Sequence, residues 1–138
     1  PTANGLDATH CHMTNSLNTP VEALEHAYPY HVRRYQIRRG SGGAGRFRGG
    51  HGIRREIDVL GPAEVTVLSD RRRGSPYGLQ GGSPGKPGRN LLVVPGPDGK
   101  HRSEDIPGKA SMHVDARTVI CIHTPGGGGY GEPENGDK

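Results

Sequence analysis

The sequence has no tryptophan, one phenylalanine and two cysteines in 138 residues, and hydrophobic residues make up only 30% of it. No apolar run approaches the roughly 20 residues that a membrane-spanning helix needs, so we predict no membrane segment. Cys11 and Cys121 stand at no metal-type spacing, and two cysteines do not make a disulfide framework. We therefore expect reduced thiols and a cytoplasmic protein.

Glycine and proline are abundant, with 24 and 12 residues respectively, a content at which disorder becomes an alternative to folding. The apolar residues nevertheless cluster into short runs separated by turn residues, which disordered chains lack. The pattern indicates a loop-rich β domain with a thin core. Such a domain is expected to need a partner surface for stability.

Arginine clusters carry the net charge of +4. Basic stripes can mark nucleic-acid binding, but almost no aromatic residues lie between these arginines to stack on bases. Nucleic acid is therefore an unlikely partner, and a self-standing anion- or nucleic-acid-binding β module is kept only as the alternative function. Asp70 precedes one cluster, which we interpret as a structural ion-pair network, with anion binding as the second interpretation. The clusters are Arg33–Arg34, Arg38–Arg39, Arg46–Arg48, Arg54–Arg55 and Arg71–Arg73.

One helix is predicted near the N-terminus. Thr19 would cap it, Pro20 would take its first position, and Glu22 would complete a capping box. Pro29 limits the helix to about residues 21–26, because a proline cannot continue it.

The rest of the chain predicts a mostly β, antiparallel, sandwich- or barrel-like domain covering residues 1–131, with a disordered tail over 132–138. Alternating residues predict strands at 32–38 and at 53–69, where Gly61-Pro62 would join two strands as a hairpin. Further strands are expected at 91–94, which precedes a turn, around 112–114, and at 117–123. The last strand is continuously apolar, which predicts burial on both faces and an inert Cys121.

Five glycines within six residues follow that strand, from Gly126 to Gly131. A fixed glycine run costs backbone entropy, so either it is disordered or another backbone approaches too closely for a Cβ. The spacing formally matches a dinucleotide-binding fingerprint, but no helix can follow it, so we reject that interpretation.

His10 and His12 could share a metal ion, because residues i and i+2 of a strand point to the same side, and Asp7 could add an oxygen ligand. We favour backbone hydrogen bonding or a polar interface as the explanation of the pair. A catalytic metal site usually has three protein ligands. We therefore assign no metal to this chain and keep His10 and His12 only as weak candidates.

Four blocks, in order, resemble the hydantoinase B/5-oxoprolinase family and cover most of the chain. They are HMTNSLNTPVE at 12–22, SGGAGRFRGGHG at 41–52, SDR at 69–71 with GLQGG at 78–82 and PG at 84–85, and TPGGGGYG at 124–131. The resemblance extends to the B-type subunits of acetone and acetophenone carboxylases. It covers only the C-terminal part of a full-length family member, and the family's upstream metal-binding motifs are absent.

The resemblance implies a small subunit or C-terminal segment of a heteromeric ATP-dependent enzyme. Such enzymes hydrolyse cyclic amides, such as hydantoins or 5-oxoproline, or carboxylate a ketone. The expected partners are a hydantoinase A-type subunit that uses ATP and a larger B-type chain. ATP with Mg²⁺ and a divalent metal are expected in those partners, no cofactor in this chain, and no catalysis by this chain alone.

Within that hypothesis, this chain supplies scaffold and one wall of an active site, with its catalytic residues unknown. The candidate cleft residues are His10, His12, Asn15 and Asn18. The glycine stretches 42–50 and 126–131 would be places where neighbouring chains approach, so a substitution at Gly128 is expected to disturb assembly more than folding. The candidate interface glycines are Gly43, Gly45, Gly49, Gly128 and Gly129.

Overall fold

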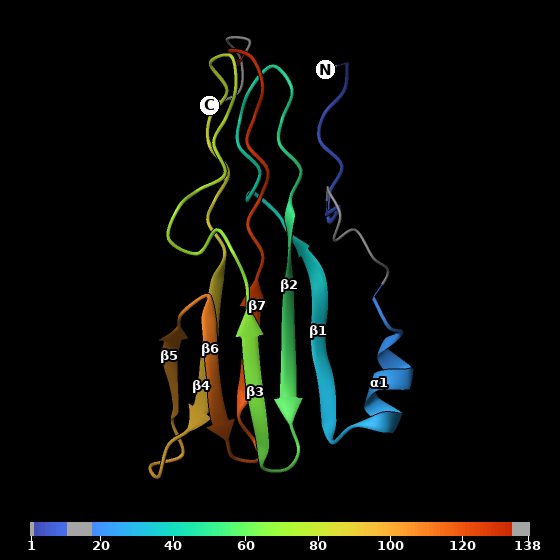
Figure 1. Cartoon of the computed structure of the whole chain (residues 1–138), viewed down its shortest axis with the longest axis vertical. Helices are drawn as coiled ribbons and strands as arrows, with labels where there is room; N and C mark the ends of the chain where they lie inside the picture. The colour runs from blue at the N-terminus through green and yellow to red at the C-terminus, as the bar shows by residue number, and fades with distance from the viewer. Residues whose placement is uncertain (1, 11–17, 134–138) are drawn as a thin grey trace.

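The computed structural model describes residues 2–10 and 18–133, and its strands fill one half of an elongated molecule (Figure 1). Five strands form one antiparallel sheet in the order β1-β2-β7-β4-β5. The mostly β, antiparallel prediction is confirmed. The strands of this sheet are β1 Tyr30–Arg38, β2 Gly52–Val59, β4 Arg89–Pro95, β5 His101–Ile106 and β7 Val119–His123.

Two further strands, β3 (Ala63–Leu68) and β6 (Lys109–Val114), pair antiparallel and pack on one face of the larger sheet. The core lies between the two sheets, where alternate residues of each strand point inward and remove apolar surface from water. The molecule is therefore a small two-layer sandwich with open sheet edges. The buried core cluster consists of Val59, Leu92, Val114 and Ile120.

The predicted hairpin over residues 53–69 is wrong. The two strands exist, but β2 pairs with β1 and β7, whereas β3 pairs with β6 in the other sheet. The turn at residues 60–62 therefore carries the chain from one layer to the next. Both strands have apolar inward faces, and packing these faces together buries more apolar surface than pairing the strands edge to edge.

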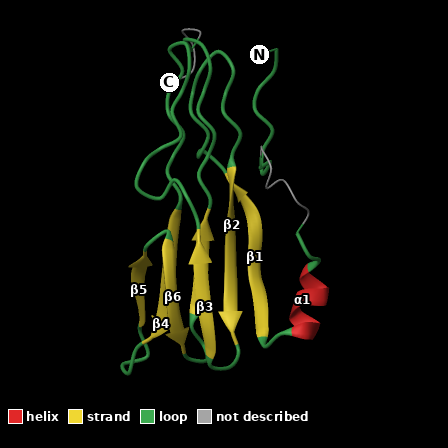
Figure 2. Ribbon diagram, viewed as in Figure 1, coloured by secondary structure: helices red, strands yellow, loops and turns green. Residues whose placement is uncertain are grey.

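The one helix among residues 2–10 and 18–133, α1, spans Val21–Ala27 and lies beside β1 (Figure 2). Its predicted capping was wrong. Pro20 occupies the N-cap position, and no side chain caps the first turn. No helix among residues 2–10 and 18–133 has the length and apolar character needed to cross a membrane.

The last strand, β7, lies in the middle of the five-stranded sheet, between β2 and β4. Val119, Ile120 and Cys121 are all buried, as its apolar sequence predicts. Burial, reinforced by the neighbouring Glu56 carboxylate, raises the pKa of the Cys121 thiol. Because the thiolate is the reactive form, Cys121 is a core residue rather than a nucleophile.

The other half of the molecule contains long extended segments without regular strands (Figure 2). Three segments run side by side there, at residues 41–50, 77–88 and 125–131, and we call them the first, second and central segments of the glycine bundle. Their hydrogen bonds join backbone to backbone between the segments. The bundle therefore continues the sandwich, and the glycine run at 126–131 is ordered.

Along the central segment, the direction in which the backbone N–H groups point repeats every three residues. The N–H groups of Gly126 and Gly129 donate to carbonyls of the second segment, over 3.1 and 2.9 Å. The N–H groups of Gly127 and Tyr130 donate instead to the first segment, over 2.8 and 2.9 Å. Three residues per turn, with hydrogen bonds made only to other segments, is the arrangement of a polyproline II helix.

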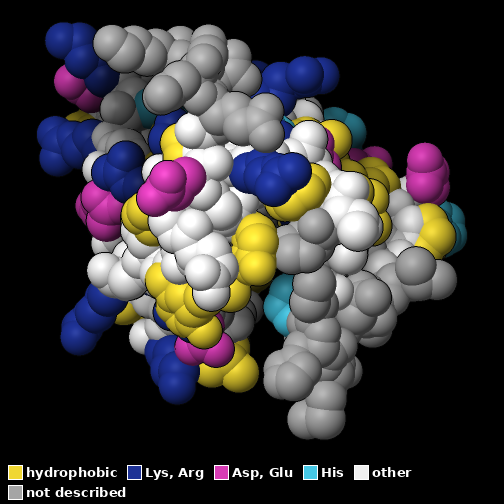
Figure 3. All heavy atoms as spheres, turned by 90° about the horizontal axis from the view of Figure 1, so that it is seen from above, with side chains coloured by type: hydrophobic (Ala, Val, Ile, Leu, Met, Phe, Trp, Pro, Cys, Tyr) yellow, Lys and Arg dark blue, Asp and Glu magenta, His cyan; other side chains and the backbone are white. Residues whose placement is uncertain are grey.

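This packing explains the glycines, because the segments approach too closely for side chains. A Cβ on Gly126 would collide with the Ser41 carbonyl, and one on Gly129 would collide with the Ala44 carbonyl. Glycine is required on the axis of collagen for the same steric reason. Seen from above, white atoms, which are backbone and uncharged polar side chains, lie among scattered basic, acidic and hydrophobic side chains (Figure 3).

Candidate functional site

A groove of about 360 Å³ lies where the glycine bundle meets the five-stranded sheet. Three parts of the chain line it: the N-terminal residues 5–10, the stretch 50–53 at the start of β2, and residues 124–127 after β7. The groove therefore gathers segments from both ends and the middle of the sequence. Its lining includes two histidines, His10 and His51.

Backbone hydrogen bonds hold the N-terminal segment against the first segment of the bundle. The Gly5 N–H donates to the Arg48 carbonyl over 2.7 Å, and the Ala8 N–H donates to the His51 carbonyl over 2.8 Å. The Arg48 N–H donates in turn to the Asn4 side-chain oxygen over 2.8 Å. These bonds thereby hold residues 5–10 in place as one wall of the groove.

Asp7 strengthens this attachment through its carboxylate. Its Oδ1 accepts a hydrogen bond from the His51 backbone N–H over 2.8 Å and from the Arg48 guanidinium over 3.2 Å. The His51 hydrogen bond, together with Arg48, holds the pKa of Asp7 below its ordinary value. Asp7 is thus an ionised clamp on the wall of the groove rather than a proton donor at neutral pH.

We expect Asp7→Asn to loosen residues 4–10, because the amide loses the ion pair with Arg48. Hydrogen exchange at the Gly5 and Ala8 amides should become faster, while the strands keep their protection. The pKa of Asp7 is depressed in the folded protein. In the unmutated protein the Asp7 carboxylate therefore holds the N-terminal segment fully above about pH 4, and this attachment weakens as the pH falls through the folded pKa.

The matched control is Asp115→Asn, a substitution at an exposed carboxylate beyond β6. It should leave exchange at residues 4–10 unchanged. Equal protection of the N-terminal segment in both variants would contradict the clamp.

The His51 ring is oriented by the bundle. Its Nδ1 accepts a hydrogen bond from the Gly42 N–H over 3.0 Å, so in the neutral ring the proton is on Nε2. A neutral imidazole held in one tautomer offers a single N–H donor, which can bind a carbonyl oxygen or transfer a proton. The orientation makes His51 the best-positioned polar group of the groove.

The residues proposed from sequence are not all brought together. His10 lines the groove, but Asn18 does not, because its Nδ2 donates to the Tyr35 hydroxyl over 3.1 Å. His12 and Asn15 lie outside the described residues. Among residues 2–10 and 18–133, no three His, Cys, Asp or Glu side chains gather to hold a metal ion, and the weak metal hypothesis for His10 and His12 stays a prediction.

The candidate interface glycines make their close contacts inside this chain. A Cβ on Gly43 would collide with the Ser83 carbonyl, one on Gly49 with the Gly127 carbonyl, and one on Gly128 with the Tyr77 carbonyl. Gly45 and Gly129 are enclosed in the same way. A substitution at Gly128 should therefore disturb folding directly, contrary to the expectation from sequence. Contacts with other chains at these glycines stay a prediction.

Sequence reasoning missed His51 and Arg48, although both lie within the glycine-rich block at 41–52. The block is recognised by its glycines, and its few large side chains form no pattern of their own. A large polar residue among glycines has few side chains of its own segment to contact, so its protein contacts are expected on another segment. That signal was available for Arg48, which contacts Asp7.

Comparison with known proteins identifies the family. The model of the hydantoinase B/oxoprolinase family matches residues 1–133. The chain belongs to this family. The resemblance inferred from the four sequence blocks is confirmed.

The relatives are much longer than this chain. 5-Oxoprolinase 1 of Arabidopsis thaliana is 43% identical over 131 residues, which are 95% of this chain and 10% of that protein. The 5-oxoprolinase of Dictyostelium discoideum is 42% identical over 135 residues, which are 98% of this chain and 10% of that protein. This hydantoinase B/oxoprolinase segment thus spans about a tenth of these relatives.

Two solved structures contain a similar fold. A nucleotide-free acetone carboxylase matches with a TM-score of 0.78 at 19% identity, covering 98% of this segment and 22% of the matched chain. The ATP-dependent caprolactamase of Pseudomonas jessenii matches with a TM-score of 0.65 at 29% identity, covering 82% of this segment and 20% of the matched chain. The sandwich with its glycine bundle is thus part of larger proteins in both cases.

Proposed function

We propose that this chain is a small subunit or C-terminal segment of a hydantoinase B-type protein in a heteromeric, ATP-dependent enzyme that opens cyclic amides. 5-Oxoproline and caprolactam are both cyclic amides, and the 5-oxoprolinases and the caprolactamase named above are among the similar proteins. Carboxylation of a ketone, which the sequence resemblance also implies, is the second outcome to test.

The groove supports this proposal more than any other feature. Two of its three walls, at residues 50–53 and 124–127, come from the blocks that carry the family resemblance, and the third, at residues 5–10, precedes the first block. His51 would place its Nε2–H toward the carbonyl or the leaving group of a substrate. The expected role of this chain is to form one wall of the active site, with further groups supplied by the rest of the enzyme.

The partners would be an A-type subunit that uses ATP and the larger part of the B-type protein. ATP with Mg²⁺, and a divalent metal, would be bound by those parts. Phosphorylation makes an amide or carbonyl oxygen a better leaving group, which is the chemical reason for ATP use. Large apolar side chains remain exposed on β1, including Tyr35 and Ile37, and they offer a surface for a neighbouring part of the enzyme.

The test is reconstitution of the assembled enzyme with His51→Asn in this segment. The Asn Oδ1 can still accept the Gly42 hydrogen bond, whereas the Nε2–H donor is lost from the groove. We expect ATP-dependent turnover of 5-oxoproline to fall by about a hundredfold or more, the range for loss of one proton-transfer group. Bicarbonate-dependent use of a ketone is measured alongside.

The control is His113→Gln on β6, an exposed histidine outside the groove, which should keep full turnover. Normal turnover by the assembled His51→Asn enzyme would exclude the proposed role of the groove. Turnover by the isolated chain, or its failure to associate with the A-type and B-type parts, would exclude the subunit role.

A further inference from the structure

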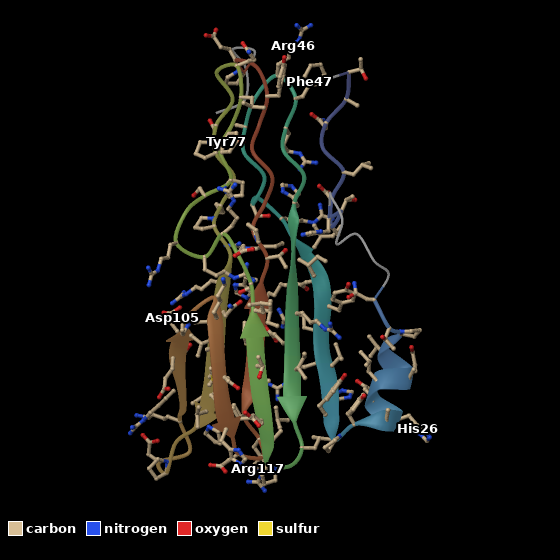
Figure 4. The ribbon with its side chains drawn as sticks, viewed as in Figure 1. His26, Arg46, Phe47, Tyr77, Asp105 and Arg117 are labelled. Atoms are coloured by element: carbon tan, nitrogen blue, oxygen red, sulfur yellow. The ribbon has the colours of Figure 1, made fainter. Side chains whose placement is uncertain are left out.

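A second hollow, of about 430 Å³, lies beside the loop that follows β3, far along the sequence from the histidine groove. The loop residues 69–74 line it together with residues 107–108, which join β5 to β6, and Lys109, the first residue of β6. In Figure 4 this loop bulges from the side of the molecule between Tyr77 and Asp105. The hydantoinase B resemblance assigns no role to it.

The hollow carries an excess of positive charge. Arg71, Arg72, Arg73 and Lys109 line it against a single acid, Asp70. None of these four cations forms an ion pair with a carboxylate of the described residues, so the ion-pair network predicted around Asp70 is wrong. The adjoining hollow contains Asp105, but that carboxylate is already engaged by Arg89 in two hydrogen bonds of 2.6 and 2.7 Å.

Arg72 is the centre of this charge. Its Nη1 donates to the Asp70 backbone carbonyl over 2.6 Å, and its Nε donates to the Asn90 side-chain oxygen over 3.1 Å. Both acceptors are neutral. Burial lowers the pKa of Arg72, the nearby Asp70 charge partly offsets this effect, and the Arg38 charge adds to it. A half-buried cation without a directly paired carboxylate is unfavourable, and proteins usually pair such a charge.

The surroundings hold Arg72 in place. Asn90 is only 1% exposed, and its Nδ2 donates to the Ser69 hydroxyl over 3.0 Å. Glycines leave room for the arginine on two sides, because a Cβ on Gly88 would lie 2.6 Å from its Nη1 and one on Gly108 would lie 3.3 Å from its Cγ. A buried amide and two glycines thus fix a guanidinium that has no carboxylate partner.

We propose that this hollow binds a phosphate-class oxyanion, with Arg72 as the central ligand and Arg71, Arg73 and Lys109 supplying further positive charge. Guanidinium groups match phosphate geometry through paired N–H donors, and such charge-assisted hydrogen bonds are the strong ones. The bound anion would pair directly with Arg72, which no carboxylate of the described residues does. This site goes beyond the proposed groove function and does not depend on which reaction the enzyme performs.

The occupant is a small phosphate or a phosphoryl group rather than a nucleic acid. Binding of single strands combines basic grooves with aromatic rings on which bases stack. The lining of this hollow contains no aromatic residue, and the nearby Tyr77 ring already has the Arg71 guanidinium 5.8 Å from its centre. The charge therefore suits a compact anion.

The test is a titration of the 138-residue chain with inorganic phosphate, at constant ionic strength, followed by amide shifts in heteronuclear NMR. We expect saturable shifts confined to residues 69–74, 88–90 and 107–109. Arg72→Gln should weaken binding by about tenfold, as loss of a bidentate charged contact predicts. Arg73→Gln, a change at an exposed side chain outside the Asn90 network, should weaken it severalfold without affecting the fold.

Arg102→Gln on β5 is the matched control and should change the affinity by less than about twofold, as for a distant surface charge. Methyl phosphate separates the two sources of the anion. Binding as tight as that of inorganic phosphate indicates a phosphoryl group carried on a larger molecule, and much weaker binding indicates the free ion.

Three results would overturn the proposal. One is the absence of saturable shifts with either probe. Another is a set of shifts spread over all arginine clusters and unchanged by Arg72→Gln and Arg73→Gln. The third is an oligonucleotide that binds the hollow more tightly than methyl phosphate after correction for its number of phosphates.

Discussion

Gly128→Ala should lower the free energy of unfolding by about 3 kcal/mol or more, at the upper end for overpacking. The new methyl group would collide with the Tyr77 carbonyl, which belongs to another segment of the bundle and cannot rotate away as a side chain could. For a domain of this size, the melting temperature should fall by about 10 °C. Urea unfolding and calorimetry measure both quantities.

Gly74→Ala is the matched control, since a Cβ at Gly74 meets nothing within 4 Å. Its free energy of unfolding should change by no more than about 0.5 kcal/mol. If the two alanine variants were equally stable, the close packing of the glycine bundle would be refuted.

Ser41→Ala should cost about 2 kcal/mol, because it removes the polar group that joins the bundle to the sandwich. Ser41 is fully buried, and its hydroxyl donates to the Arg38 carbonyl over 2.7 Å and accepts from the Gly52 N–H over 2.9 Å. Alanine removes one hydrogen-bond partner from each of these two backbone groups. Hydrogen exchange at Gly52 should accelerate together with the loss of stability.

Ser75→Ala, in the exposed loop that follows β3, is the control for the loss of a hydroxyl and should be close to neutral. Slow exchange at Gly52 in the Ser41→Ala protein would show that another group had replaced the serine. That result would remove Ser41 as the link between the two halves.

The sequence predicted which residues form strands better than which strands pair. Alternating residues identified the stretches that became β2 and β3, because period two follows from strand geometry alone. Their partners depend on where β1, β6 and β7 are placed, and no local pattern encodes that. A short Gly-Pro turn suited a hairpin, yet the turn joins two layers.

The candidate site was predictable in part. His10 was identified from its spacing to His12, and the glycine blocks were identified as places of close approach. The backbone segment that packs against each glycine could not be predicted from the sequence, since the absence of a Cβ does not indicate which segment fills the space. His51 acquires its defined tautomer only from the Gly42 N–H, a contact that exists once the first segment has folded back on itself.

The three-residue turn of the central segment also limits how its length can change. Adding or removing one residue within 126–131 would rotate every later residue by about 120°, so that each inward-facing glycine would be replaced by its neighbour. The Tyr130 side chain, whose ring lies 6.5 Å from that of Phe47, would then turn toward a different segment. Insertions and deletions in this part of the family should therefore occur in multiples of three.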